Sequence, residues 1–181
     1  MARKSTKHQR RFARSFGKLL VKEAKKNLKG RGSGSLSGSL KSKVTQKGYK
    51  LSISLTGAKH NEFINQGVSG TKKQQSYKDE KGNKKKSSFA FKSMNVNIGA
   101  IMKFISHNNI KGRDELGRFV RSKSLAYLIS RSVASKGIKS SSHMSKAWLK
   151  LKKRYTKGLL KAVQKDAEED IRKEQQNNMK W

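Results

Sequence analysis

The stretch LKSKVTQKGYKLSISL, residues 40–55, decides the fold class of this 181-residue chain. Apolar residues take every second position of its latter half: Tyr49, Leu51, Ile53 and Leu55. This alternation is typical of a half-buried strand, and Lys47-Gly48 supplies a turn before it. The stretch therefore predicts an antiparallel hairpin of strands 40–46 and 49–55. Residues 88–92, SFAFK, alternate in the same way and are predicted to join the same sheet.

Apolar residues recur every three or four positions on both sides of this hairpin, which predicts helices. The first helix covers residues 8–29 and has a single apolar stripe: Phe12, Phe16, Leu19, Leu20, Ala24 and Leu28. Later helices are predicted at 98–105 and 124–135. A long final helix is predicted from about Ser145 to the end, outreaching the core. We expect the sheet to pack on the helices near 12–28 and 124–135, which makes the fold α+β.

Two stretches of unusual composition indicate connections between these elements. Residues 30–39, GRGSGSLSGS, stop the first helix. A flexible linker is favoured there over a phosphate-binding loop, because no Gly-Lys-Ser/Thr follows a strand. Residues 72–87 hold seven Lys and no aliphatic side chain, which predicts an exposed loop. Between them, residues 60–66 are expected to form a short helix with Phe63 and Ile64 pointing inward.

We expect the chain to divide into three segments. Residues 1–39 form a basic N-terminal helix with its Gly/Ser linker, 40–140 an α+β core with the Lys-rich loop, and 141–181 the long C-terminal helix. Five of the eleven acids fall in the last sixteen residues: Asp166, Glu168, Glu169, Asp170 and Glu174. We expect this acidic end to lie against the basic face of a neighbouring subunit. Truncation after Lys165 should then spare folding and weaken assembly.

The final helix also carries side chains of the size that anchors an interface: Trp148, Tyr155 and Leu159. Aromatic residues are over-represented at interface hot spots, so these three residues are predicted to bind a partner. The alternative is a helix that only closes its own domain.

Charge dominates the composition, because 45 Lys and Arg face 11 Asp and Glu and leave a net charge of +34. Such a chain repels itself unless a polyanion lies beside it, and nucleic acid is the first candidate. The bases concentrate in the first helix with its leader and in the Lys-rich loop. The predicted nucleic-acid-binding residues are Arg3, Lys4, Lys7, Arg10, Arg11, Arg14, Lys72, Lys73, Lys78, Lys81, Lys84, Lys85 and Lys86. Aromatic residues are not interleaved with them as in single-strand stacking platforms, so we expect phosphate contact that is independent of base sequence.

The composition argues against catalysis and against cofactors. The absence of Cys excludes disulfides, thiolate zinc sites and Cys nucleophiles. None of the four His has a metal-type partner, the paired acids are expected to be solvated, and no Gly-x-Ser-x-Gly elbow occurs. Apolar runs reach at most five residues, and the basic N-terminus lacks the apolar segment of a secretory signal. We therefore expect a protein that is not an enzyme, binds no metal or cofactor and contacts no membrane.

Two stretches resemble segments of a known family. Residues 63–71, FINQGVSGT, follow the hairpin, and residues 126–138, AYLISRSVASKGI, precede Met144–Trp148 in the final helix. With the strand pattern between them, roughly residues 10–165 resemble the tail-completion, or neck, proteins of tailed bacteriophages. The chain departs from the family's pattern in its Lys-rich loop, its very high charge and the absence of Pro before the final helix.

The resemblance implies a structural virion protein made in the host cytoplasm. It implies a ring-forming α+β subunit, in roughly six or twelve copies, between the portal or adaptor and the tail. Phage genomic DNA would pass through this ring without base-specific contact, and no catalysis is implied. Gly67 and Gly70 are expected in a tight turn after the short helix, with an ordinary loop as the alternative.

The charge leaves a second function open, a non-specific nucleic-acid-binding protein of histone-like or ribosomal type. For a ring-forming subunit, like charges oppose association at low ionic strength. We therefore expect the isolated protein to be monomeric or poorly ordered, with rings forming only on a portal or adaptor template.

Overall fold

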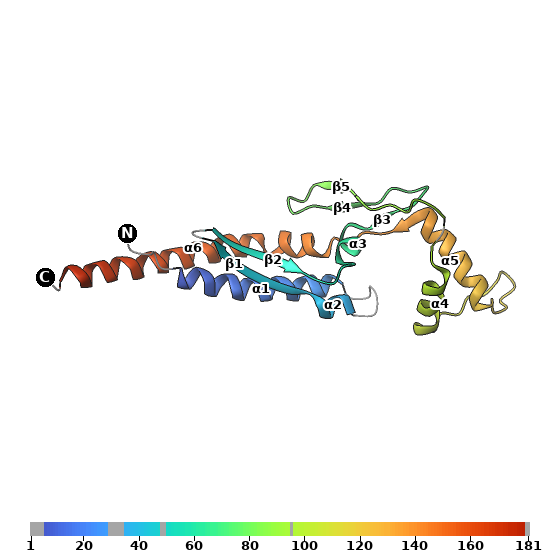
Figure 1. Cartoon of the computed structure of the whole chain (residues 1–181), viewed down its shortest axis with the longest axis horizontal. Coiled ribbons are helices and arrows are strands. Elements are labelled where there is room, and N and C mark those ends of the chain that lie inside the picture. Colours follow the sequence, from blue (N-terminus) through green and yellow to red (C-terminus); the bar gives the residue numbers. More distant parts are fainter. Residues whose placement is uncertain (1–5, 29–34, 48–49, 95, 180–181) are drawn as a thin grey trace. The chain divides into compact units, whose positions relative to one another are not determined.

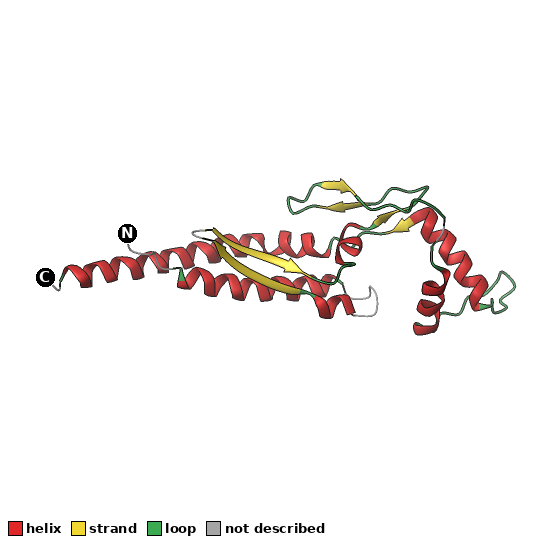
Figure 2. Cartoon of the chain, in the orientation of Figure 1, coloured by secondary structure: helices red, strands yellow, loops and turns green. Residues whose placement is uncertain are grey.

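The computed structural model describes residues 6–28, 35–47, 50–94 and 96–179. Within these ranges it has six helices and six short strands in three antiparallel pairs, which confirms the predicted α+β class (Figures 1 and 2). The chain forms two compact units, each described by itself below. The first unit combines Met1–Asn61, Glu80–Gly82 and His143–Trp181, and the second combines Glu62–Asp79 and Asn83–Ser142.

Two long helices and a hairpin make up most of the first unit. Its elements are α1 (Lys7–Asn27), α2 (Ser35–Ser39), β1 (Lys41–Lys47), β2 (Lys50–Thr56) and α6 (His143–Asn178). α1 and α6 run antiparallel: the side chain of Asn27 donates to the carbonyl of His143 at one end. At the other end His8 meets Glu169. The predicted hairpin is confirmed, and it lies along α1 with Lys47 opposite Lys50 at its turn (Figure 2).

Two predictions about the sheet are wrong. Residues 88–92 do not join the hairpin: in the described part of the chain that sheet has two strands, and Ala90 forms a single bridge to Ser69 in the second unit. The helix predicted at 124–135 belongs to the second unit as α5 (Ser122–Lys136), where it packs against α4 (Ile98–His107). Periodicity identifies an element, but it does not identify the partner of that element.

Small and aromatic side chains build the contact of α1 with α6. The buried positions of α1 recur every three or four residues: Ala13, Phe16, Gly17, Leu20 and Ala24. Phe16 meets Tyr155 and Trp148 of α6, with ring centroids 5.0 and 6.3 Å apart. Phe12 lies over Gly158, where a Cβ would strike its ring. Gly158 therefore lets an aromatic side chain lie directly on the backbone of α6.

A buried carboxylate fixes the start of α1. Asp166 of α6 is 2% exposed and accepts hydrogen bonds from the backbone N–H groups of His8 at 2.8 Å and Gln9 at 3.0 Å. The first four N–H groups of a helix have no partner within it, and negative charge is favourable beside them. Asp166 is thus an N-terminal cap supplied by another helix. A cut after Lys165 removes this cap, so we now expect truncation there to destabilise the first unit instead of sparing its folding.

The second unit brings together the two stretches that resemble the neck proteins. Its helices are α3 (Asn61–Gln66), α4 and α5, and its strands are β3 (Val68–Ser69), β4 (Ser76–Lys78), β5 (Lys84–Lys86) and β6 (Gly137–Ile138). Asn61, the first residue of α3, is assigned to the first unit. β3 pairs with β6, which places Val68 opposite Ile138.

Glycine is required at this pairing because the backbones approach so closely. Gly67 and Gly137 have φ angles of 78° and 76°, in the region that favours glycine. A Cβ on Gly70 would strike the carbonyl oxygen of Ser135. The N–H of Gly67 donates to the carbonyl of Phe63 at 2.8 Å and ends α3. The tight turn predicted after the short helix is confirmed at Gly67.

The Lys-rich stretch was predicted to be an exposed loop. Its Lys side chains are exposed, but part of the stretch forms two short strands. Its strands β4 and β5 pair, with Tyr77 opposite Lys85 and Lys78 opposite Lys84. The hydroxyl of Ser87 donates to the carbonyl of Gly67 at 2.6 Å and ties the end of this hairpin to the β3 turn. The pairing of β4 with β5 gives hydrogen-bond partners to the backbone groups of these lysines. Composition alone does not reveal such pairing.

The short helix α3 is confirmed, but Phe63 does not point into a core as predicted. Its side chain is 43% exposed and contacts the ring of Phe89 with centroids 4.3 Å apart. Ile64 is half-buried, and its carbonyl accepts hydrogen bonds from Ser141. The end of α3 is therefore held by polar contacts more than by apolar burial.

Removing the Asp166 cap should destabilise the first unit. Asp166→Ala leaves the N–H groups of His8 and Gln9 without their acceptor, which should lower the free energy of unfolding by about 1–3 kcal/mol. Chemical denaturation followed by helical circular dichroism measures the loss. Glu168→Ala, at an exposed position of the same helix, is the matched control and should leave the midpoint nearly unchanged. Equal losses in both variants would contradict the capping role.

The contact of Phe12 with Gly158 can be tested by adding one methyl group. Gly158→Ala should lower the stability by about 1–3 kcal/mol although Ala favours helices, because the methyl group strikes the ring. Gly38→Ala in α2 is the control, since a Cβ there meets nothing within 4 Å and should be neutral or stabilising. Thermal unfolding compares the two, and a stabilised Gly158→Ala would show that the helices do not approach so closely.

Candidate nucleic-acid interface

Five basic side chains form one strip along the outer face of α1. This basic strip consists of Lys7, Arg10, Arg11, Arg14 and Lys18, all of them exposed. Each member lies three or four positions, about one helical turn, from another member, so all five share one face of the helix. The opposite face holds the buried residues that pack on α6 and the hairpin. The apolar stripe that directs α1 inward therefore also directs the basic strip toward solvent.

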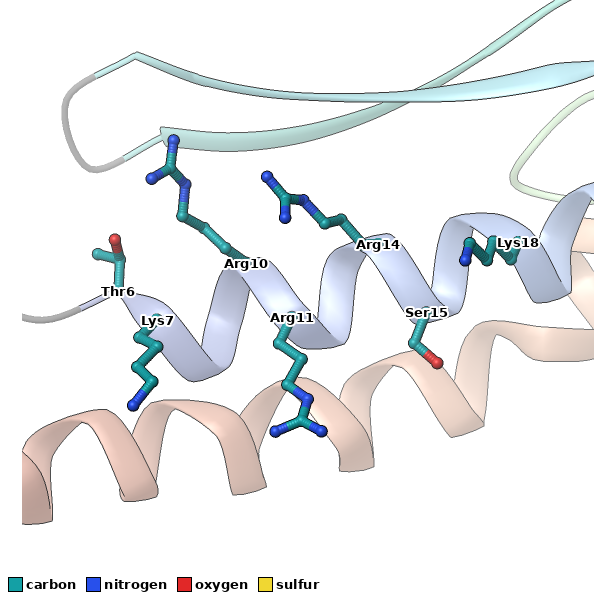
Figure 3. A pocket seen from close by; sticks show the side chains of 7 residues that line it. All are labelled: Thr6, Lys7, Arg10, Arg11, Arg14, Ser15 and Lys18. Carbon is teal, nitrogen blue, oxygen red and sulfur yellow. The ribbon is translucent and has the colours of Figure 1, made fainter.

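The strip surrounds an open hollow of about 670 Å³ lined by Thr6, Lys7, Arg10, Arg11, Arg14, Ser15 and Lys18. Figure 3 shows Arg10 and Arg14 reaching toward the side of the hairpin, while Lys7 and Arg11 reach toward the side of α6. Among the described residues, the lining side chains come from Thr6 and α1. The hollow is therefore a charged surface for an extended ligand and not an enclosed pocket.

No carboxylate in the described residues forms an ion pair with the strip. Two acids of the first unit instead join its helices. Lys150 lies 2.5 Å from Glu23, and this hydrogen bond lowers the pKa of Glu23 below its ordinary value. His8 lies 2.6 Å from Glu169 and lowers the pKa of that carboxyl in the same way, helped by the charge of Lys7. The acids are thus used between α1 and α6, and the outward face stays positive.

This arrangement suits phosphate groups. A guanidinium binds phosphate oxygens through parallel N–H donors, and Lys acts as a point charge. From Lys7 to Lys18 the strip spans about 16 Å, and one strand of B-DNA presents about five phosphates over that axial length. The helix N-terminus itself is not free to bind an anion, because Asp166 occupies it. A phosphate at this face would therefore be met by the side-chain cations of the strip and not by the backbone of the helix N-terminus.

The Lys-rich hairpin is a second basic site, and it lies on the second unit. Lys78, Lys84, Lys85 and Lys86 are exposed on β4 and β5. Lys85 is partly neutralised by Asp79, whose carboxylate lies 3.4 Å away.

The structure therefore divides the predicted nucleic-acid-binding residues. Lys72 and Lys73 are exposed in the segment before β4, and Lys81 is exposed in the short piece assigned to the first unit. Arg3 and Lys4 lie outside the described residues.

The residues predicted to bind a partner lie partly inside the fold. The rings of Trp148 and Tyr155 contact each other in a tilted arrangement, with centroids 5.4 Å apart, and both contact Phe16, so they serve the contact of α1 with α6. This favours, for these two side chains, the alternative of a helix that closes its own domain. Leu159 is half-buried. The expected use of the acidic end between subunits is corrected for Asp166 and Glu169, which act within their own chain.

Several basic residues that lie on the surface of the first unit were not named as candidates from the sequence. Lys18 lies four positions after Arg14, so the helical spacing of the strip already predicted that it belongs there. The outer face of the β1–β2 hairpin is also basic, with Lys41, Lys43, Lys47 and Lys50 exposed. Their alternation along β1 was a usable signal, because every second residue of a strand shares a face.

An exposed aromatic residue in the second unit was also missed. Phe119 is 63% exposed, and the guanidinium of Arg113 lies 4.3 Å from its ring centroid. The loop is shaped by Asp114, which accepts hydrogen bonds from the N–H groups of Leu116 and Arg118. This loop shows no periodic pattern in the sequence. The only usable signal was the occurrence of Arg residues close to Phe119, which allows a cation–π contact.

The described residues contain no group of three or more His, Asp or Glu placed to hold a metal ion. Over the same residues, no helix combines the length and the apolar character needed to cross a membrane. Comparison of the chain with family models, with curated proteins and with solved structures found no match.

Neutralising the basic strip should weaken DNA binding and reduce its dependence on salt. If about six phosphates are engaged, raising salt from about 50 to 200 mM should weaken binding about a thousandfold. Arg10→Gln, Arg11→Gln and Arg14→Gln together should reduce the slope of log affinity against log salt by about 2.7. Fluorescence anisotropy with a labelled duplex measures both quantities.

The matched control removes the same charge from the outer face of α6. Lys153→Gln, Lys157→Gln and Lys161→Gln together change three exposed bases away from the strip. Their effect on the salt slope should be clearly smaller. Equal slopes for the two triple variants would show that total charge governs binding, and the strip would then have no special role.

Proposed function

We propose that this chain is a structural virion protein: a ring-forming neck or tail-completion subunit that joins the portal or adaptor to the tail. The observation that carries the proposal is the pairing of β3 with β6. The two stretches that resemble neck proteins lie far apart in sequence, yet their backbones meet in this pair. Glycines occupy the positions at which any larger residue would collide. The shared pattern of these stretches is thus tied to one three-dimensional contact.

The basic strip supports a role beside DNA. A channel subunit needs attraction to passing phosphates without a preference for any base sequence, and phosphate contacts position DNA without specifying it. The outer face of α1 suits this need, because it presents Lys and Arg side chains while its aromatic side chains are turned toward α6. In this proposal the strip lines the DNA channel, the chain has no catalytic role and it requires no cofactor.

A histone-like or ribosomal protein is the second candidate, supported by the basic outer face of the β1–β2 hairpin. That face adds four exposed Lys to the unit that carries the strip. Binding from several sides favours wrapping or bridging of nucleic acid. A channel subunit would need only its inner side to be basic, so the two candidates differ in where the protein resides and in how many copies act together.

Quantitative mass spectrometry of cell fractions tests the proposal. In cells that produce this chain, we expect it in purified DNA-filled particles at a fixed count of roughly six or twelve copies per particle. Deleting the gene should leave filled heads that do not join tails, because the connecting ring is missing. The ribosomal large-subunit and nucleoid fractions serve as controls. Recovery mainly in either of those fractions would overturn the virion function and favour the second candidate.

A further inference from the structure

α6 carries a second apolar stripe that does not face α1. Its members, Leu160, Val163, Ala167 and Ile171, are spaced by three and four residues and are all exposed. Leu160 is 59% and Ile171 55% exposed. The first stripe, which includes the buried Leu151 and Ala162, packs within the unit. α6 therefore has one apolar face in contact with α1 and another that faces solvent.

This second stripe runs to the part of α6 that extends past the start of α1. Glu169 meets His8 near the first turn of α1, and α6 continues to Asn178, which adds about 13 Å of helix (Figure 1). Glu168 and Glu174 lie three positions before and after Ile171, so all three share one face. Both carboxylates are exposed and form no ion pair with the described residues. The end of α6 thus presents an apolar centre between two acids.

The outer face of α5 has the opposite pattern of charge. Tyr127 and Leu128 are 49% and 59% exposed at its centre. Together with Ile98, Lys123 and Ser124 they line an open groove of about 410 Å³. Arg131, one turn further on, lies over the ring of Tyr127 and donates to its hydroxyl at 3.3 Å. Neither α4 nor α5 contains an acid, so this groove is an apolar centre flanked by bases.

We propose that the end of α6 of one copy docks into the groove between α4 and α5 of a second copy. Ile171 and the second stripe then cover Tyr127 and Leu128. Glu168 and Glu174 meet the bases at positions 123 and 131. The two patterns complement each other in both polarity and sign of charge, which is why the occupant is a second copy of this chain.

Two different surfaces meet in this contact, so the contact is heterologous and can repeat from copy to copy. Such a contact closes into a ring or continues as a helical filament, depending on the rotation between copies. The choice of a ring rests on the proposed function. Each contact also places two acids beside an acid-free basic face, which reduces the repulsion between neighbouring copies. The inference therefore names the subunit interface of the proposed ring.

Engineered cysteines test this interface directly, because the chain has no Cys of its own. Ile171→Cys and Leu128→Cys are purified separately, mixed and oxidised at about 0.15 M salt, where a Debye length of about 8 Å screens distant charges. We expect a disulfide-linked dimer that contains one of each variant as the main product. Leu116→Cys is the matched control, since Leu116 is 75% exposed in the second unit but outside the groove. Mixed with Ile171→Cys, it should give at least tenfold less product.

Charge reversal shows whether the contact depends on the complementary charges. Glu168→Lys with Glu174→Lys on the Ile171→Cys chain should reduce the yield at least fivefold. Lys123→Glu with Arg131→Glu on the Leu128→Cys chain should then restore it. Circular dichroism checks that each exposed substitution leaves the fold intact.

Three outcomes would overturn the proposal. They are no product above the Leu116→Cys control, a main product that joins two Ile171→Cys chains, and cross-linking confined to one chain when both cysteines are in it. None of these outcomes affects where the protein is found in the cell. Failure of the interface and failure of the virion function are therefore observed separately.

Discussion

The first unit depends on holding two strongly basic helices side by side. α1 and α6 repel each other through their charges, and this repulsion must be offset where they touch. Phe12, Phe16 and Tyr155 supply apolar and aromatic contact there. Three carboxylates add to it: Glu23 of α1 binds α6, while Asp166 and Glu169 of α6 bind α1. Because these acids are turned inward, the basic strip on the outer face of α1 has no acid paired with it among the residues that the structure describes.

The sequence predicted the elements better than it predicted their partners. The helix around Phe16 and the strand around Ile53 follow from local periodicity, which needs no knowledge of the rest of the chain. Residues 88–92 have the alternation of a strand but pair elsewhere. The burial of Asp166 depends on His8, 158 positions away, and no local pattern reports such a contact. Contacts between residues far apart in the sequence could therefore not be predicted from local patterns.

The basic site was predictable in kind and only partly in extent. A stripe such as Phe12, Phe16 and Leu20 directs the remaining face of α1 to solvent, so Arg10 and Arg14 had to be exposed. Trp148 was taken for a partner anchor because of its size, but size does not distinguish an inner face from an outer one. Gly158 lies on the face of α6 that meets α1, and its missing side chain leaves room for the ring of Phe12. The buried Leu151 and Ala162 belong to the same helix, so no single residue reports this face in the sequence.

In the proposed interface, different faces of the end of α6 serve folding and assembly. If the acids of its end acted only between subunits, α1 would lose the cap that Asp166 provides, and association would compete with folding. Asp166 and Glu169 are three positions apart and face α1. Glu168 and Glu174 lie on the side of Ile171, away from α1. One face of this helix end therefore satisfies its own unit, while Glu168 and Glu174 on the other face form no ion pair with any described residue. In the proposed interface, a neighbouring copy is then bound without unfolding the first turn of α1.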